Sequence, residues 1–524
     1  MKKLKINLIG ISLFLLCFSS CTDDLNTEPK VEKTLEQLLR ENPNAIKGLV
    51  SKMYGAFALS GPNGPASSDI SDDAGESPFL RGIINLQDFT ADGVKNRWGD
   101  NGLDQLTTTS GWTSSNKFFR YLYNRIYYTV PQCNNIIAVL NSVTVPDGPK
   151  YQAELRFLRC LAYYYMIDCF GKGVIVTEAD LGSAIPKAQS SRIEMFNYVE
   201  SELLDVEGII PATNGYGQAN KSVVRMLLAK LYLNAAVYTG TPRYNDALNY
   251  VNKVIGGGYT LAPNFQSLFQ ADNNISAARN EIIYPLIADA VVSQSYGNTT
   301  YLVNGCLSSD TMTLSTYGAT AGWAGHRATK AWYGLFGSNA AALASSPDDR
   351  SKIFFTSGHS FEMTDYKTWI NGYPVTKFRN SNSTGPGITT EFSGTDFPLF
   401  RLADAYLMFT ECVVRGANFP GVTATNAQAL TYLNAVRTRS NAIPATNSDL
   451  NLNYILDERA RELNLEGHRR TDLIRFGKFT GSSYLWPWKG NSVNGTSISN
   501  EYNLFPIPLT ATQSNPNLTQ NPGY

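Results

Sequence analysis

Three carboxylates fall on one face of a predicted helix near the end of the chain. Glu458, Glu462 and Glu466 lie at i, i+4 and i+8 within 457–475, and glycoside hydrolysis needs only two suitably spaced carboxylates. The same segment carries arginines four residues from its acidic residues, which is how a helix face forms ion pairs. We interpret the segment as an ion-paired helix and predict no catalytic residue. Glycoside hydrolysis is the alternative.

Other side chains that support catalysis or bind metals do not form a recognisable pattern. The histidines, His326, His359 and His468, show no metal-ligand spacing, and the chain has no GxSxG, HExxH or P-loop motif. Asp272 and Asp396 lie in loop-rich sequence and offer the oxygen ligands that calcium prefers. We predict no cofactor and no catalytic metal, and leave open a structural Ca²⁺ that ties loops together.

A short apolar segment near the start of the chain ends in a cysteine. Three lysines precede an apolar run, 6–18, that is too short to span a bilayer, and two serines stand before Cys21. This is the layout of a bacterial lipoprotein signal peptide. We predict cleavage before Cys21, acylation of Cys21 (palmitate) and attachment of the mature chain to a membrane. Ordinary secretory cleavage nearby is the alternative.

Composition excludes some classes of partner. Loss of residues 1–20 removes three of the 44 basic residues and none of the 44 acidic ones, which leaves a net charge of −3. We therefore predict no nucleic-acid binding, because that function depends on surplus positive charge. The chain has 29 Tyr, 25 Phe and 7 Trp but only 17% charged residues, a balance typical of extracytoplasmic proteins that handle carbohydrate. Its cysteines after Cys21 lack CxxC spacing, which argues against a disulfide framework or a zinc site.

Two helical blocks must position whatever site the chain carries. The first runs from about 116 to 256, and apolar residues recur at helical spacing over 154–170, 222–238 and 399–414, each followed by a glycine. All three helices carry Ala-x-x-Tyr, and the first two copies lie 67 residues apart, close to two tetratricopeptide periods of about 34 residues. We predict an all-α fold of irregular tetratricopeptide-like helix pairs. Buried helices of another kind would also carry Ala and Tyr at these spacings.

The segment between the blocks, 259–397, is rich in Gly, Ser, Thr and Asn. We predict that 293–325 and 380–394 form turns and long loops without a helix. The earlier region 60–115 has the same character and carries Trp98 and Trp112. Long ordered loops with many aromatic residues indicate a functional surface on a rigid base.

These features divide the chain into six parts. We predict a signal peptide (1–20), a lipidated tether (21–40), an N-terminal helical scaffold (41–258) with a binding loop (60–115), a loop-rich ligand-binding insertion (259–397), a C-terminal helical scaffold (398–480) and a Pro/Asn-rich tail (481–524).

The segment LEGHRRTDLIRFG at 465–477 resembles the C-terminal signature of the SusD/RagB family of outer-membrane lipoproteins. AELRFLR at 153–159, FGK at 170–172, PLFRLADAY at 398–406 and the tail motifs FPIP and NPGY also resemble that family, in the expected order. The resemblance implies a tetratricopeptide-like scaffold that sits as a lid on a SusC-like TonB-dependent outer-membrane transporter. It further implies that the protein binds glycan at the cell surface for import.

Several loops resemble the starch-binding member of the family more narrowly. They are GES before Arg81, YG at 296–297, GW at 322–323 and YLWPWKG at 484–490. This resemblance implies an arc of aromatic platforms, Trp98, Tyr296 and Trp323, with Arg81 and Asn101 as groups that bind sugar hydroxyls. The implied ligands are starch, amylopectin, malto-oligosaccharides or a similar α-glucan.

The chemistry of such an arc is plain, because a pyranose presents an apolar face and a rim of hydroxyl groups. The chain departs from the starch binder at Asn96, where that protein has another tryptophan. We expect Trp486 and Trp488, which flank Pro487, to serve packing. A SusD-like binder of a different polysaccharide is the alternative function.

Overall fold

The computed structural model describes residues 33–70, 73–385 and 387–524. The predicted signal peptide, Cys21 and most of the tether lie outside the described residues. Within those ranges no helix is both long and apolar enough to cross a membrane.

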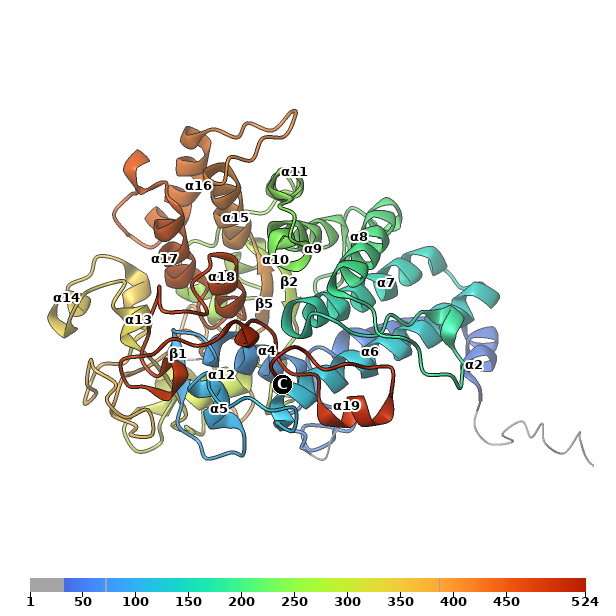
Figure 1. Ribbon diagram of the computed structural model, residues 1–524, viewed down its shortest axis with the longest axis horizontal. Helices are drawn as coiled ribbons and strands as arrows, with labels where there is room; N and C mark the ends of the chain where they lie inside the picture. The colour runs from blue at the N-terminus through green and yellow to red at the C-terminus, as the bar shows by residue number, and fades with distance from the viewer. Residues whose placement is uncertain (1–32, 71–72, 386) are drawn as a thin grey trace, which may run out of the picture.

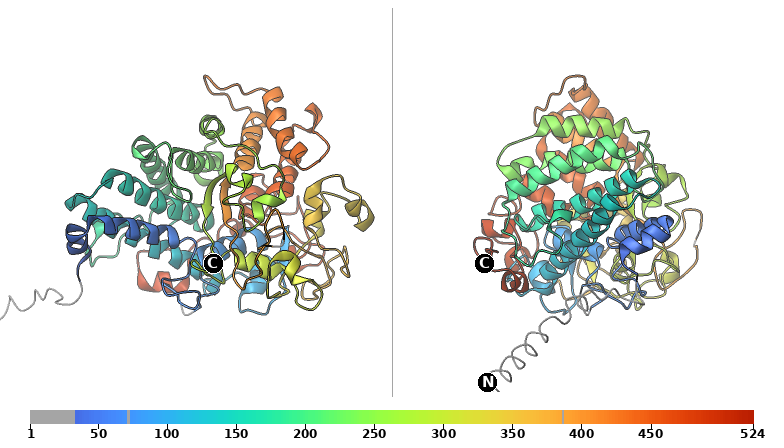
Figure 2. Two further views of the ribbon diagram at one scale, coloured as in Figure 1. Left: turned by 180° about the vertical axis from the view of Figure 1, so that it is seen from behind. Right: turned by 90° about the vertical axis from the view of Figure 1, so that its right-hand side faces the viewer.

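The fold is a stack of helices that pack side by side. In chain order, α6 packs on α7, α7 on α8, α8 on α9, α9 on α11, α11 on α15 and α15 on α16, and the right-hand view of Figure 2 shows these layers edge-on. This confirms the predicted scaffold of tetratricopeptide-like helix pairs. The scaffold helices are α2 (Leu35–Glu41), α3 (Ile46–Gly55), α6 (Lys117–Ser142), α7 (Gly148–Tyr165), α8 (Arg192–Ile209), α9 (Lys221–Leu233), α10 (Ala235–Thr239), α11 (Tyr244–Ile255), α15 (Leu402–Val414), α16 (Asn426–Arg439), α17 (Leu452–Leu463) and α18 (Arg469–Arg475).

Capping residues explain where the first block begins and where its helices stop. The Asn116 side chain accepts a hydrogen bond from the Phe118 backbone N–H and so begins α6. A π-helical turn extends α7 to Phe170, and Gly171 ends it at φ 76°. Gly240 ends α10 in the left-handed region at φ 80°, where glycine carries no Cβ penalty. Both glycines were predicted as stops.

Two small sheets accompany the helices, and the sequence pattern did not indicate them. Strand β1 (Val94–Asn96) pairs antiparallel with β3 (His326–Ala328), which pairs with β4 (Tyr373–Pro374). Strand β2 (Ile282–Leu286) pairs antiparallel with β5 (Phe397–Arg401). The predicted helix over 399–414 is therefore wrong at its start, because those first residues belong to β5, and α15 begins at Leu402.

The loop-rich regions contain short helices that composition concealed. The prediction that 293–325 forms no helix is wrong for α12 (Thr299–Cys306), which the Asn298 side chain caps and which is buried along its whole length. A helix buried on every side shows no alternation of apolar and polar faces, so periodicity cannot reveal it. The other short helices are α4 (Phe79–Ile84), α5 (Leu103–Thr107), α13 (Lys330–Tyr333), α14 (Ala340–Ala344) and α19 (Leu509–Ser514). In Figure 1, α5, α12 and β1 lie together beside the helical stack.

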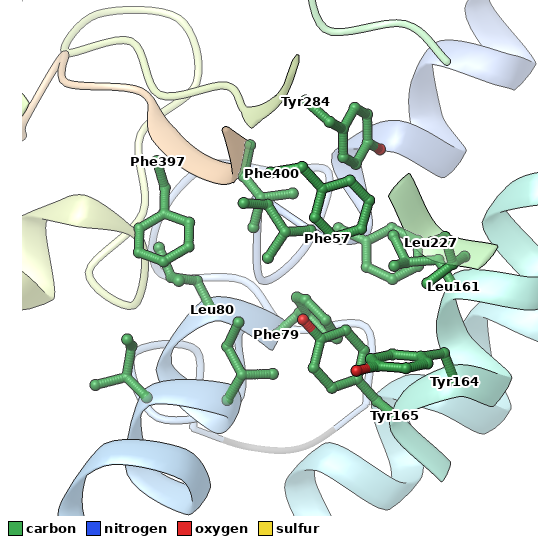
Figure 3. Packing of buried hydrophobic residues seen from close by; sticks show 14 of the residues in the cluster. Phe57, Phe79, Leu80, Leu161, Tyr164, Tyr165, Leu227, Tyr284, Phe397 and Phe400 are labelled. Carbon is green, nitrogen blue, oxygen red and sulfur yellow. The ribbon is translucent and has the colours of Figure 1, made fainter. Parts of the chain in front are cut away.

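The hydrophobic core joins the stack to the loop-rich side. Phe79 of α4 packs edge-on against Phe57 at a ring-centroid distance of 4.8 Å and against Tyr165 of α7 at 5.0 Å. Tyr284 of β2 lies 5.8 Å from Phe400 of β5. Figure 3 shows these rings meeting between the strands and the helices. The core therefore fixes the loop-rich side rigidly on the scaffold.

Candidate functional site

The carboxylates near the chain end are not a catalytic pair. Glu458 and Glu462 are 0% exposed and Glu466 is 1% exposed, so a polysaccharide cannot reach them. Glu462 accepts hydrogen bonds from Arg401 at 2.6 Å and Arg350 at 2.9 Å, and also pairs with Arg439. Burial would raise the pKa of Glu462, but these three arginines hold it well below its usual range. The three glutamates thus hold an ion-pair cluster together, and hydrolysis at this helix is excluded.

The candidate metal ligands are engaged by protein groups. Among the described residues no group of three or more His, Cys, Asp or Glu side chains could hold a metal ion. Asp272 accepts hydrogen bonds from the Ser383 backbone N–H and hydroxyl, and Asp396 accepts one from the Ala288 N–H at 2.8 Å. Burial raises the pKa of Asp396 to about 6. The question of a structural calcium ion stays open.

The three aromatic residues predicted as platforms lie in a continuous row. The ring centroids of Tyr296 and Trp323 are 6.5 Å apart, and those of Trp323 and Trp98 are 6.3 Å apart. All three side chains are half-buried, so packing holds each ring in place while part of each ring stays accessible to a ligand. We call these residues the arc. Their contact with a ligand stays a prediction.

Helix α12 positions two members of the arc. Tyr296 stands two residues before the Asn298 cap at the start of the helix. Trp323 lies at the other end, where its backbone N–H donates to the Asn304 carbonyl at 2.7 Å and the Ala324 N–H donates to Leu307 at 2.7 Å. Because the carbonyls at the end of a helix need partners, the loop that carries Trp323 supplies them. The hydroxyl of Tyr296 donates to Glu391 at 2.8 Å, which fixes that ring from outside.

The pairing of β1 with β3 brings Trp98 to the row. Asn96 pairs with His326, and the backbone N–H of Arg97 donates to the Gly325 carbonyl at 3.2 Å. Trp98 therefore faces the loop that carries Trp323. The indole Nε1 of Trp98 donates to the Trp323 carbonyl at 3.0 Å. The side chain of Asn96 is fully buried and accepts from the Trp98 N–H at 2.6 Å. At this departure from the starch binder, the chain therefore has a residue that fixes Trp98.

The two predicted polar residues differ in exposure. Arg81 is only 8% exposed: its guanidinium lies 4.4 Å from the Tyr301 ring centroid and 5.8 Å from that of Trp98, and donates to the Gly75 carbonyl at 3.1 Å. Asn101 is exposed in the turn before α5, and its amide has no hydrogen-bond partner among the described residues. The structure thus places Arg81 against the Trp98 and Tyr301 rings, whereas Asn101 lies in an exposed turn three residues after Trp98.

Gly325 lies directly against the Trp98 ring, and we predict that Gly325→Ala weakens any ligand binding that uses Trp98. A Cβ atom there would come within 2.4 Å of the indole ring, so the ring must move, at a cost of about 1–3 kcal/mol. Thermal unfolding measures the loss of stability, and ligand titration measures the loss of affinity. Gly99→Ala is the matched control, because a Cβ at Gly99 meets nothing within 4 Å. Equal behaviour of the two variants would contradict the prediction.

His326 forms the floor beneath Trp98, and we predict that it stays neutral from pH 8 to pH 5. Its ring is fully buried, 5.1 Å from the Trp98 ring centroid, and burial, with Arg81 and Arg327 nearby, lowers its pKa well below 6.5. Since the unfolded chain binds this proton more readily, His326 lowers stability progressively as pH falls below about 6.5. The Cε1 proton resonance in NMR spectra should not shift over that range. A midpoint near pH 6.5 would contradict the assignment.

Some residues at the site had no signal in the sequence. Lys367 donates to the Trp98 carbonyl at 2.9 Å and pairs with Asp104. Both of these partners lie more than two hundred positions from Lys367 in the sequence. Glu391, which lies in a different loop from Tyr296, accepts the hydrogen bond from the Tyr296 hydroxyl. Contacts between distant loops leave no periodic pattern, so only covariation among related sequences could have indicated them.

Comparisons with known proteins show the family of the chain. The profile of the SusD family matches residues 364–524. The starch-binding protein SusD of Bacteroides thetaiotaomicron is 32% identical, with 97% of this chain and 96% of that protein covered. A SusD-like protein of Formosa agariphila is 23% identical, with 99% of this chain and 100% of that protein covered.

Solved structures share the fold. Surface glycan-binding protein A from Bacteroides thetaiotaomicron, in complex with laminarihexaose, aligns with a TM-score of 0.68 at 19% identity, over 91% of this chain and 99% of that one. A SusD superfamily protein from Parabacteroides distasonis aligns with a TM-score of 0.70 at 20% identity, over 92% and 99%.

Proposed function

Because the chain belongs to the SusD family, we propose that it is a cell-surface glycan-binding lipoprotein that captures starch or a related α-1,4-glucan on the arc. The observation that carries this proposal is the unbroken row of half-buried rings, Tyr296, Trp323 and Trp98, at 6.5 Å and 6.3 Å spacing. The relative at 32% identity is named a starch-binding protein. The protein is not an enzyme: it binds glycan and leaves cleavage to others.

The arc suits weak binding to a polymer. Three platforms that each cover roughly 50–100 Å² of apolar surface, at about 25 cal/mol per Å², yield a few kcal/mol before ordering costs. Dissociation constants from about tens of micromolar to millimolar follow. Repeated units of one polysaccharide raise the effective concentration at the arc, so a weak single contact is sufficient for capture.

Anchorage completes the proposed role. Acylation of Cys21 would hold the protein at the outer membrane, facing the cell exterior, and the helical face of the stack would dock on a SusC-like TonB-dependent transporter that receives the glycan. Co-purification from native membranes tests this part of the proposal. Recovery of the lipoprotein with no transporter would contradict it.

Affinity electrophoresis of the soluble chain without residues 1–21 tests the ligand. Gels would contain amylopectin, pullulan, dextran, inulin or xylan. We expect retardation by amylopectin and pullulan only. A structure of the same fold holds laminarihexaose, so a different polysaccharide is the second candidate, and retardation by one of the other glycans would favour it. If none of the five glycans retards the protein, the proposal that it captures one of them is overturned.

A further inference from the structure

We propose that the glycan site continues past Trp98 onto a second group of residues, Asp104, Tyr366, Lys367 and Trp488, which takes further glucose units of the same chain. We call this group the distal subsite. The inference rests on the proposed function of α-glucan capture. It assigns a binding role to Trp488 of the YLWPWKG segment, which its place beside Pro487 suggested to be a packing residue, and to three residues outside every motif.

The distal subsite adjoins the arc through direct contacts. The Lys367 ammonium donates to the Trp98 carbonyl at 2.9 Å and to Asp104 at 2.5 Å. The same ammonium lies 5.2 Å from the ring centroid of Tyr366. The Tyr366 ring in turn packs edge-on against Trp488 at 4.8 Å and 71°. The contacts therefore run from the Trp98 backbone through Lys367 and the buried Tyr366 ring to Trp488.

The exposed groups of the distal subsite have the chemistry of a sugar site. The side chains of Lys367 and Asp104 are 37% and 51% exposed, and such a pair contributes only about 0–1 kcal/mol to stability. Its ammonium and carboxylate can donate to and accept from sugar hydroxyls. Asn101, exposed three residues before Asp104, adds an amide in the turn that precedes α5. A polar cluster flanked by a half-exposed indole matches the rim and the face of a pyranose.

Trp488 is held rigidly in an unfavourable backbone conformation. Its φ is +71°, which bulky residues rarely adopt and which persists only where the surroundings enforce it. Its backbone N–H donates to Ser492 at 2.9 Å, and its indole Nε1 donates to the Met363 carbonyl at 3.1 Å. Neighbouring Trp486 is 1% exposed and serves packing, as predicted. Trp488 is half-buried, so the loop fixes one indole in the core and offers the other at the surface.

Isothermal titration of malto-oligosaccharides of two lengths tests the distal subsite. Maltotriose is short enough for the arc alone, whereas a long chain such as maltodecaose reaches further. For Trp488→Ala we expect maltodecaose affinity to fall about 5- to 10-fold, with maltotriose affinity retained, and Trp488→Tyr should restore part of the loss. Leu485→Ala is the matched control, because Leu485 is an exposed apolar residue, 45% exposed, of the same loop.

The outcomes separate the distal subsite from the proposed function. If wild-type protein binds both sugars and Trp488→Ala weakens both equally, or neither, the distal subsite is overturned while α-glucan capture stands. If wild-type protein binds neither sugar, α-glucan capture itself fails, and the distal subsite fails with it. Equal melting temperatures of Trp488→Ala and Leu485→Ala would exclude misfolding as the cause of a loss.

Discussion

Replacement of Tyr296 and Trp323 by alanine in one chain is expected to abolish retardation in amylopectin gels. Each ring offers roughly 50–100 Å² of stacking surface, so the pair contributes about 2.5–5 kcal/mol, or about 60- to 4,000-fold in affinity. Because the starting affinity is weak, the remaining binding would fall below detection. Affinity electrophoresis beside wild-type protein measures the effect.

A control for this experiment must remove similar rings elsewhere. Tyr259→Ala/Tyr432→Ala is matched, since both tyrosines are half-buried and lie beside α11 and on α16, which Figure 1 shows far from α12. This variant should migrate like wild-type protein in every gel. If it loses retardation, or if the arc variant keeps it, the arc is not the binding surface.

Glu462→Ala is expected to destabilise the fold by about 3–5 kcal/mol, because it leaves the buried guanidinium groups of Arg350, Arg401 and Arg439 without a shared carboxylate. A chain of this length loses about 1 °C of melting temperature per kcal/mol, so we expect a fall of about 3–5 °C. Calorimetry measures it. A catalytic Glu462 would instead leave stability unchanged and control the release of reducing sugar.

Glu362→Ala provides the comparison for an exposed pair. Glu362 and Lys330 are 57% and 43% exposed, and the loss of such a pair costs about 0–1 kcal/mol. The pH dependence adds a second check: because the folded-state pKa of Glu462 is depressed, its contribution is complete above about pH 4.3 and is lost as pH falls. A Glu462→Ala chain as stable as Glu362→Ala would contradict the role of the cluster.

The helical stack was largely predictable, and the reason is local. Amphipathic stripes and stop glycines such as Gly171 and Gly240 act within a few residues, so they are visible in one sequence. Helix α12 was missed because burial on all sides removes the stripe. Strand β5 was assigned to the start of a helix because its first four residues, FPLF, are apolar, and a short apolar run fits either structure.

The site was predictable only in part. Motif resemblance gave Tyr296, Trp323 and Trp98, and the structure brings them into one row. Lys367 was not predicted, because its partners lie in a distant loop, and Trp488 was expected to serve packing, because it stands beside Pro487. Whether a half-buried aromatic faces solvent depends on tertiary contacts, which sequence spacing does not contain.

The pairing of β2 with β5 has a consequence for how such proteins diversify. These strands carry residues 282–286 and 397–401, so the long segment between them leaves the scaffold and returns to it at adjacent points. Since the entropic cost of a closed segment grows only with the logarithm of its length, about 0.6 kcal/mol per doubling, its loops can lengthen or be exchanged with little strain on the helices. The same helical scaffold can therefore carry a different binding surface in another protein.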